Sequence, residues 1–523
     1  MKRRDFLKGA AAGVAVASLP SIGGRGVNVL AQSPSKRAMD QLLSGSDNIL
    51  VLIQLDGGND GLNTIIPIEN ADYYNQRESI AISKNNALPL NDTLGWHPAL
   101  GGLRDLYDAE KLTVVQGVTY PNPNRSHFRG TDIWMTASDS DVFLSSGWLG
   151  RYLEPKYPDF PEVLPDDPLA IQIGSKVSLA FNSDAGKMAV TFRDPDEFYR
   201  LVGGVDPENP DLLTPDTVAG DELTFVRTIH DASQTYSERV HDASVAGNNA
   251  VAYPGDDNPA QNQLAQSLKI VARLISGGLQ TRLYLVSLRG FDTHAQQDAI
   301  HTGLLTQLSD AVKAFMDDMD QQNQGDKVAG MTFSEFGRRV QENGSAGTDH
   351  GAAAPLLVFG NRVLGKRVHG QDPDLVNLDD RGDLIMQFDF RSVYASVLAQ
   401  WFGEADNDIQ SVLLGEWSRI PIFREDDVTG VNGPNGDPVF ELRHTPNPLN
   451  TEGTIHYSLP VPAHARITLY DVHGRKLAVL FAGEQAAGPH TLRLDARRLT
   501  PGSYFYRIEA GRQSATQMLQ VVR

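Results

Sequence analysis

The sequence contains no cysteine among its 523 residues. This excludes disulfide bonds, thiolate catalysis and zinc sites built on sulfur. Any metal ion must therefore be held by histidine, aspartate, glutamate or hydroxyl oxygen. Positive charge is also scarce, since 46 Lys and Arg stand against 65 Asp and Glu, which gives a net charge of −19. Such a chain is not expected to bind nucleic acid, because phosphate backbones select basic surfaces.

Long apolar runs are absent beyond the N-terminus. There, a basic head from Lys2 to Arg4 precedes an Ala/Gly/Val-rich run over residues 9–19, which is too short to anchor the chain in a bilayer. The stretch KRRDFLK resembles the twin-arginine export signal, and small residues before Gln32 suit cleavage there. Residues 1–31 are therefore expected to be an export signal. No other segment reaches about 18 apolar residues, so we expect no membrane span in the mature protein.

Strand patterns alternate with helical patterns over residues 47–424, which predicts an α/β domain with a mainly parallel sheet covered by helices. Strands are expected at residues 50–55, 112–116, 170–173, 281–288 and 328–333. Helices are expected at residues 97–109, 261–276, 303–319 and 391–402. The segment 138–255 is richer in Pro, Asp and Gly, and we interpret it as an insertion that covers one end of the sheet.

Residues 425–445 are polar and loop-rich, and we interpret them as a linker. The chain beyond them, residues 446–523, alternates like a small all-β sandwich. Its strands are expected at residues 454–459, 465–470, 476–481, 490–495, 502–510 and 514–522. Pro446-Asn447-Pro448, ITLYDVHGRKL and LTPGSYFYRIEAG resemble the sorting domain of type IX secretion systems. This resemblance implies passage through the outer membrane, with the module then removed or attached at the surface. The alternative is an unrelated carbohydrate-binding or fibronectin-like sandwich.

The stretch ILVLIQLDGGNDGLNT, residues 49–64, is the most informative in the chain. Its unbroken apolar run predicts a strand buried on both faces, with Asp56 at the carboxyl end. In open α/β sheets, ligands bind at that edge. The glycines after Asp56 allow close approach of the backbone, and a carboxylate there suits a hard cation. The alternative is an ordinary strand-to-loop turn.

The stretch NPNRSHFRGTDIW, residues 122–134, places Ser126 between cationic neighbours, Arg125 and His127, with Arg129 following. Cations beside a hydroxyl lower its pKa and can hold an anionic substrate group, so we predict that Ser126 is a nucleophile. The alternative is that Ser126 caps the helix that follows. Both roles are compatible, since a nucleophile at a helix N-terminus also gains from the dipole.

Further acidic and imidazole side chains follow other predicted strands. They occur in the stretches FDTHAQQDAIH, MTFSEFGR and GTDHG and comprise Asp292, His294, His301, Glu335, Asp349 and His350. A carboxylate and imidazoles gathered at strand ends are what a zinc or manganese site needs. For each residue alone, a hydrogen-bonded or solvated structural role is the alternative.

The large domain resembles the domain-of-unknown-function family 1501 in LDGGNDGLNT, HPAL, NRSHF, GFDTH, MTFSEFGR, GTDHG and FRSVYASVL. That family is similar to a distant branch of the alkaline phosphatase and sulfatase superfamily. The resemblance implies a first metal site made of Asp56, Ser126, Asp349 and His350. It implies a second site with Asp292 and His294, for which His301 and His369 are both candidate last ligands. Glu335 is expected to take over a ligand role.

These features predict an exported metal-dependent hydrolase of phosphate or sulfate esters that uses one or two divalent ions, zinc, manganese or calcium. Ser126 would attack in line, and Arg125 or Arg129 would clamp the non-bridging oxygens. The expected partners are the ester substrate and the two export machineries. One alternative is a cell-surface protein that binds a glycan or another ligand without turnover. The other is a scaffold for surface assembly whose polar clusters are structural.

Overall fold

The computed structural model describes residues 47–203, 235–424, 441–445, 449–459, 463–471, 476–486, 488–497, 499–510 and 513–522. The predicted export signal, residues 1–31, lies outside the described residues. The same holds for the Pro-Asn-Pro motif, for residues 425–440 of the predicted linker and for residues 204–234 of the predicted insertion. Among the described residues, no helix is both long and apolar enough to cross a membrane.

A nine-stranded sheet forms the centre of the large domain. Its strands are, in spatial order, β15 (Arg367–His369), β5 (Leu112–Thr119), β14 (Ala354–Gly360), β11 (Val328–Phe333), β1 (Ile49–Asp56), β10 (Leu283–Arg289), β6 (Ala170–Ile173) and β9 (Val190–Phe192), with β16 (Phe388–Asp389) beside β5. Only β14 runs antiparallel to its neighbours, β11 and β5. The predicted fold class, a mainly parallel sheet, is confirmed.

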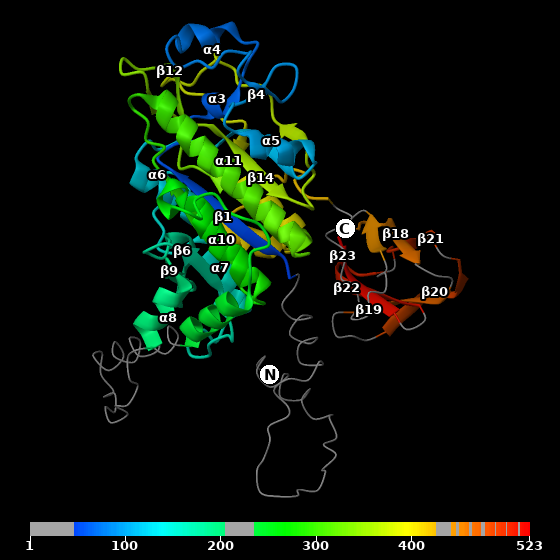
Figure 1. Cartoon of the computed structure of the whole chain (residues 1–523). Coiled ribbons are helices and arrows are strands. Elements are labelled where there is room, and N and C mark those ends of the chain that lie inside the picture. The colour runs from blue at the N-terminus through cyan, green and yellow to red at the C-terminus, as the bar shows by residue number, and fades with distance from the viewer. Residues whose placement is uncertain are drawn as a thin grey trace, which may run out of the picture. The chain divides into compact units, whose positions relative to one another are not determined.

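The first seven residues of β1 are all buried, as expected for a strand in the interior of the sheet. Val51, Ile53 and Leu55 pack into one core cluster, and Leu50 and Leu52 pack into the other. Helices cover both faces (Figure 1). On one face lie α5 (Gly101–Asp108), α10 (Gln263–Ser276) and α11 (Gln297–Gln321), and on the other α6 (His127–Thr136), α7 (Trp148–Leu153), α12 (Phe390–Ser396) and α13 (Asp406–Leu413).

The structure differs from the predicted elements in a few places. Residues 97–100 precede α5 instead of forming its first turn, and α12 continues as a π-helical turn, η6 (Val397–Trp401). The helix expected at residues 303–319 is longer, since α11 begins at Gln297. The described parts of segment 138–255 do not merely cover the sheet, because they contribute β6 and β9 to it.

The C-terminal residues form two antiparallel sheets, which confirms the predicted all-β module. One sheet has the order β17 (Glu441–Thr445), β18 (Glu452–Leu459), β21 (Gly488–Asp495). The other has the order β20 (Lys476–Gln485), β19 (Ala463–Asp471), β22 (Gly502–Ala510), β23 (Gln513–Val521). Apolar residues such as Ile455, Ile467 and Tyr506 form a separate core. The strand β17 occupies residues that were predicted to belong to the linker. It is part of the module instead, because it pairs along its whole length with β18.

Candidate metal centre

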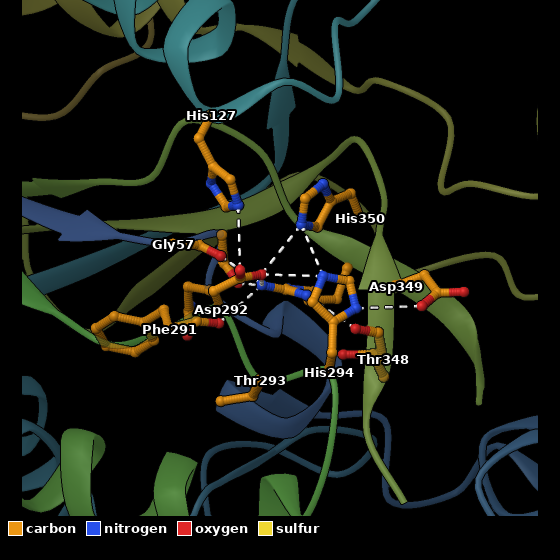
Figure 2. Close-up of polar contacts among 12 residues, drawn as sticks. Gly57, His127, Phe291, Asp292, Thr293, His294, Thr348, Asp349 and His350 are labelled. Carbon is orange, nitrogen blue, oxygen red and sulfur yellow. Dashed lines mark hydrogen bonds and ion pairs between the residues drawn. The ribbon is translucent and has the colours of Figure 1, made fainter. Parts of the chain in front are cut away.

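Three imidazoles and one carboxylate converge at the carboxyl edge of the large sheet. Asp292 follows β10, His127 begins α6, and His350 ends β13 (Thr348–His350). The ligand atoms of these three residues lie within 4.8 Å of one another. Asp292 Oδ1 is 3.0 Å from His350 Nε2 and 3.1 Å from His294 Nε2, and Asp292 Oδ2 is 3.4 Å from His127 Nε2. Figure 2 shows these side chains pointing toward one another.

Each of the three rings is oriented by an oxygen acceptor at its other nitrogen, Nδ1. The pairs are His127 with Glu335 Oε1 at 2.8 Å, His350 with the carbonyl oxygen of Arg125 at 2.8 Å, and His294 with Asp349 Oδ1 at 3.2 Å. A carbonyl or an ionised carboxylate can only accept, so Nδ1 carries the proton in each ring. The three Nε2 atoms therefore face Asp292 as potential ligands, which is how outer partners orient metal-binding histidines.

The Nε2 atoms of the cluster fit a bound cation. Those of His294 and His350 lie 3.0 Å apart, and two lone pairs at this distance repel unless a proton or a cation lies between them. His127 Nε2 is buried and has no hydrogen-bond partner among the described residues. Zinc–nitrogen bonds of about 2.0–2.1 Å place tetrahedral ligands about 3.3 Å apart. The separations of 3.0–3.4 Å between Asp292 and the three Nε2 atoms differ from this by a few tenths of an ångström.

The buried guanidinium of Arg338 connects the loops that bear the cluster. It donates to Asp292 Oδ1 at 2.8 Å, and its side chain is fully buried. It also donates to the carbonyl oxygens of Gly57, Gly58, Phe291 and Thr348. Burial alone would raise the pKa of Asp292, but the Arg338 guanidinium and the adjacent imidazoles of His350 and His127 outweigh it and bring that pKa to about 2. Asp292 is therefore ionised at neutral pH.

Gly57 lets the loop after β1 approach the loop that carries Asp292. Its φ is +123°, and a Cβ atom there would lie 2.4 Å from the backbone nitrogen of Asp292. Its own N–H donates to Glu335 Oε1 at 2.9 Å. A side chain at Gly57 would therefore displace both Asp292 and the carboxylate that orients His127.

The structure brings some predicted ligands together and gives others a different position. Asp292, His294 and His350 converge, whereas Glu335 and Asp349 contact the histidines from outside. Glu335 is almost fully buried and bonds His127, and Asp349 bonds His294 and Asn343. Both carboxylates are thus placed to orient imidazoles.

Asp56 ends β1, as predicted, but its carboxylate lies 3.6 Å from Arg289 Nε. Burial raises the pKa of Asp56, and the nearby Glu335 carboxylate raises it further, while Arg289 and His127 lower it. Among the described residues, the group whose ligand atoms lie within 4.8 Å of one another does not include Asp56.

The three residues expected to act on substrate lie in one stretch but face different partners. Ser126 is exposed at the N-cap position of α6, where its hydroxyl makes no capping hydrogen bond. Arg125 forms an ion pair with the fully buried carboxylate of Asp383. Arg129 is buried, donates to the carbonyl oxygen of Val142 at 2.6 Å, and stacks on Phe143. The side chain of Arg129 therefore stabilises the loop that follows α6.

The structure places neither His301 nor His369 at the cluster. His301 is 1% exposed, and its Nε2 lies 2.9 Å from Asn59 Oδ1. It points into the core because α11 begins at Gln297, which puts His301 on the same buried helix face as Leu305 and Leu308. His369 lies on the edge strand β15, and burial lowers its pKa. The expectation that one of them completes a metal site is not met.

Buried neutral histidines predict a loss of stability in acid. Burial lowers the pKa of His301 to about 3 and that of His97 to about 4, against about 6.5 in the unfolded chain. Between about pH 6.5 and 4, the unfolded state binds protons that the folded state does not. As the pH is lowered, the free energy of unfolding therefore decreases by up to about 1.4 kcal/mol per pH unit for each histidine.

We expect His301→Gln to reduce this slope, measured as urea unfolding from pH 7 to 4 and followed by tryptophan fluorescence. His241→Gln, at the domain surface, is the control. An unchanged slope in the His301 variant would show that this ring is not the buried base.

His127 is the cluster residue that the sequence interpretation missed as a ligand. Its motif, NRSHF, was singled out for Ser126, and His127 was considered only as a cation beside that hydroxyl. A histidine at the first residue of a helix that follows a buried strand reaches the same sheet edge as Asp292 and His350, and this was the available signal.

Three models of protein families and signals match parts of the chain. Residues 216–412 match the model of DUF1501, a family described as proteins of unknown function. This confirms the predicted family match. Residues 445–522 match the secretion system C-terminal sorting domain, and residues 1–20 match the twin-arginine translocation signal. The protein is exported through the periplasm to the cell surface or beyond. No curated protein sequence matches the chain significantly.

Solved structures resemble parts of the chain at low identity. PorU from Porphyromonas gingivalis is 18% identical over 16% of this chain and 9% of its own, with a TM-score of 0.15, so the chain spans only a small part of that protein. The PsFucS1 sulfatase from Pseudoalteromonas sp. is 11% identical over 88% of this chain and 86% of its own, with a TM-score of 0.34. An alkaline phosphatase superfamily protein from Vibrio parahaemolyticus is 9% identical over 80% and 77%, with a TM-score of 0.28. These values are too low to transfer an activity to this chain.

Proposed function

We propose that this exported protein is a metal-dependent hydrolase of phosphate or sulfate esters. The observation that supports this most directly is the convergence of three imidazole Nε2 atoms on the Asp292 carboxylate, each ring fixed by an oxygen at Nδ1. Nitrogen donors with one carboxylate suit zinc or manganese better than calcium, which takes six to eight oxygen ligands. A bound divalent cation supplies Lewis acidity toward the ester oxygen and lowers the pKa of a hydroxyl or water.

The residues around this site would have two kinds of role, as cation ligands and as groups that orient the ligands. His127, His350 and Asp292 would hold the cation, with His294 beside them. Glu335, Asp349 and the Arg125 carbonyl group orient the rings. Because Arg338 keeps Asp292 ionised, the cluster retains a negative charge in a partly buried place.

Ser126 is the proposed nucleophile. It directly precedes His127, its hydroxyl is exposed and makes no capping bond, and it lies at the N-terminus of a ten-residue helix whose dipole favours an anionic group. Attack by Ser126 Oγ on phosphorus or sulfur would form a covalent ester and break the bond to the substrate's alcohol oxygen. Water would then hydrolyse this ester and restore the serine. Asp56, whose pKa is raised by burial, is a candidate to accept and return a proton.

The variant Ser126→Ala tests this role. We expect hydrolysis of aryl phosphates and sulfates to fall by about 10³-fold or more, because the nucleophile is lost, while the cation content stays unchanged. Ser145→Ala, at an exposed position in the loop after α6, is the matched control. Full activity in the Ser126 variant would assign the attack to water and remove the covalent step.

A second candidate function is ligand binding at the cell surface without turnover. The ring of Phe128 is 88% exposed beside His127, and that of Phe143 is 78% exposed over Arg129. Exposed aromatic rings near a polar cluster suit stacking on a ligand such as a sugar. Tight binding to a glycan array, combined with inert phosphate and sulfate esters, would favour this function over hydrolysis.

A further inference from the structure

A cavity of about 280 Å³ opens at the same edge of the sheet as the cluster. It lies between the ends of β5 and β14, the short helix α3 (Gly61–Thr64), and the loop over residues 371–387. Its walls are mainly apolar, with Leu62, Ile65, Pro355, Leu384 and Ile385 among them. An apolar cavity of about 150 Å³ accommodates benzene, so this one has room for a larger ring system or a branched alkyl chain.

Two chain connections place the cavity beside the candidate metal centre. Ala353, in the cavity wall, is three residues after His350, so their Cα atoms lie at most about 11 Å apart. On the other side, Leu384 follows Asp383, which binds the side chain of Arg125. The Arg125 carbonyl oxygen in turn accepts the His350 Nδ1 proton.

One wall residue offers a hydrogen bond to an occupant. Gln116 on β5 is 4% exposed and lines the cavity, and its Nε2 has no hydrogen-bond partner among the described residues. A buried amide donor without a partner is unfavourable, and an acceptor oxygen on a bound molecule would relieve that cost. The carboxylates of Asp372 and Asp374 also line the cavity and disfavour an anionic occupant.

We propose that this cavity binds the alcohol portion of the ester substrate, and that this portion is apolar, uncharged and of the size of an aryl or branched alkyl group. The Gln116 amide would donate to an oxygen of that group. The proposal rests on the hydrolase function and deepens it, since it assigns the substrate class as small monoesters of apolar alcohols. Two carboxylates among the lining residues make highly sulfated or phosphorylated polymers poor substrates.

The test separates the cavity from the metal centre by using a probe without an anionic group. We expect 2-naphthol to bind the chelator-treated full-length protein in a fluorescence titration. Leu384→Trp, which fills the cavity from a half-buried position, should weaken this binding at least about tenfold, and Gln116→Leu should weaken it about fivefold. Leu90→Trp, another half-buried leucine outside the cavity lining, should have no effect.

The same proteins, loaded with zinc, are then assayed with 2-naphthyl and methyl esters of sulfate and phosphate. After correction for leaving-group acidity, the proposal predicts that kcat/KM is at least about tenfold higher for the naphthyl esters than for the methyl esters. Leu384→Trp should abolish this difference. Turnover with equal preference, or naphthol binding that Leu384→Trp leaves unchanged, would overturn the proposal while the hydrolase function stood. Cavity binding without cation uptake or turnover would overturn both the ester assignment and the hydrolase function.

Discussion

The variant Asp292→Asn is expected to lose zinc binding by about 10²-fold or more, and ester hydrolysis by about 10³-fold. Asp292 is the one carboxylate in the described cluster that lies within 3.4 Å of all three imidazoles. The substitution keeps the shape of the side chain but removes its charge, and it leaves the Arg338 guanidinium without an ionised partner at the site. The measurement is calorimetric titration of zinc into chelator-treated protein.

Two matched variants make this result specific. Asp349→Asn alters a carboxylate that bonds His294 and Asn343 from outside the cluster, so we expect about a tenfold loss. Asp196→Asn changes an exposed carboxylate on α8 (Pro195–Gly203) and should leave zinc binding unchanged. If Asp292→Asn bound zinc as tightly as the unaltered protein, the cation would have to be held elsewhere, and the proposed ligand set would be wrong.

Replacement of Arg338 by methionine is expected to lower the free energy of unfolding of the large domain by about 3–5 kcal/mol. The substitution leaves Asp292 and four backbone carbonyl groups without their buried donor. All five tryptophans of the chain lie within residues 96–417, so urea unfolding followed by their fluorescence reports on this domain.

Arg104→Met, on the surface of α5, is the control and should change the stability by about 0.5 kcal/mol or less. A loss below about 1 kcal/mol for the Arg338 variant would show that the loops around the cluster are held by other contacts.

The central strands could be predicted because their apolar runs are long and uninterrupted. Those of β1, β11 and β6 were located within a residue or two of their observed bounds. The strand β14 was missed although APLLVFG is apolar, because it follows a loop and an antiparallel hairpin pair instead of a helix. Short edge strands such as β15 carry too few residues for a periodic pattern.

The candidate site could be predicted only in part, for geometric reasons. Asp292 lies at the carboxyl edge of the large sheet because it follows the parallel strand β10. His350 reaches the same place from β13, which pairs antiparallel with β12 outside the large sheet. The side chains that orient them depend on loop paths, which the sequence does not reveal, so Glu335 and Asp349 were expected to bind metal directly. His301 was predicted to bind metal because the sequence does not show where α11 begins. Since α11 begins at Gln297, His301 lies on its buried face.

The central claim is that one cation joins His127, Asp292 and His350. Crystals of the exported protein grown with zinc, measured at the zinc absorption edge, test it most directly. We predict an anomalous peak within bonding distance, about 2.0–2.2 Å, of His127 Nε2, His350 Nε2 and an Asp292 oxygen. A peak bound only by surface carboxylates, or a cluster in which the imidazoles bond to one another with no peak between them, would contradict it.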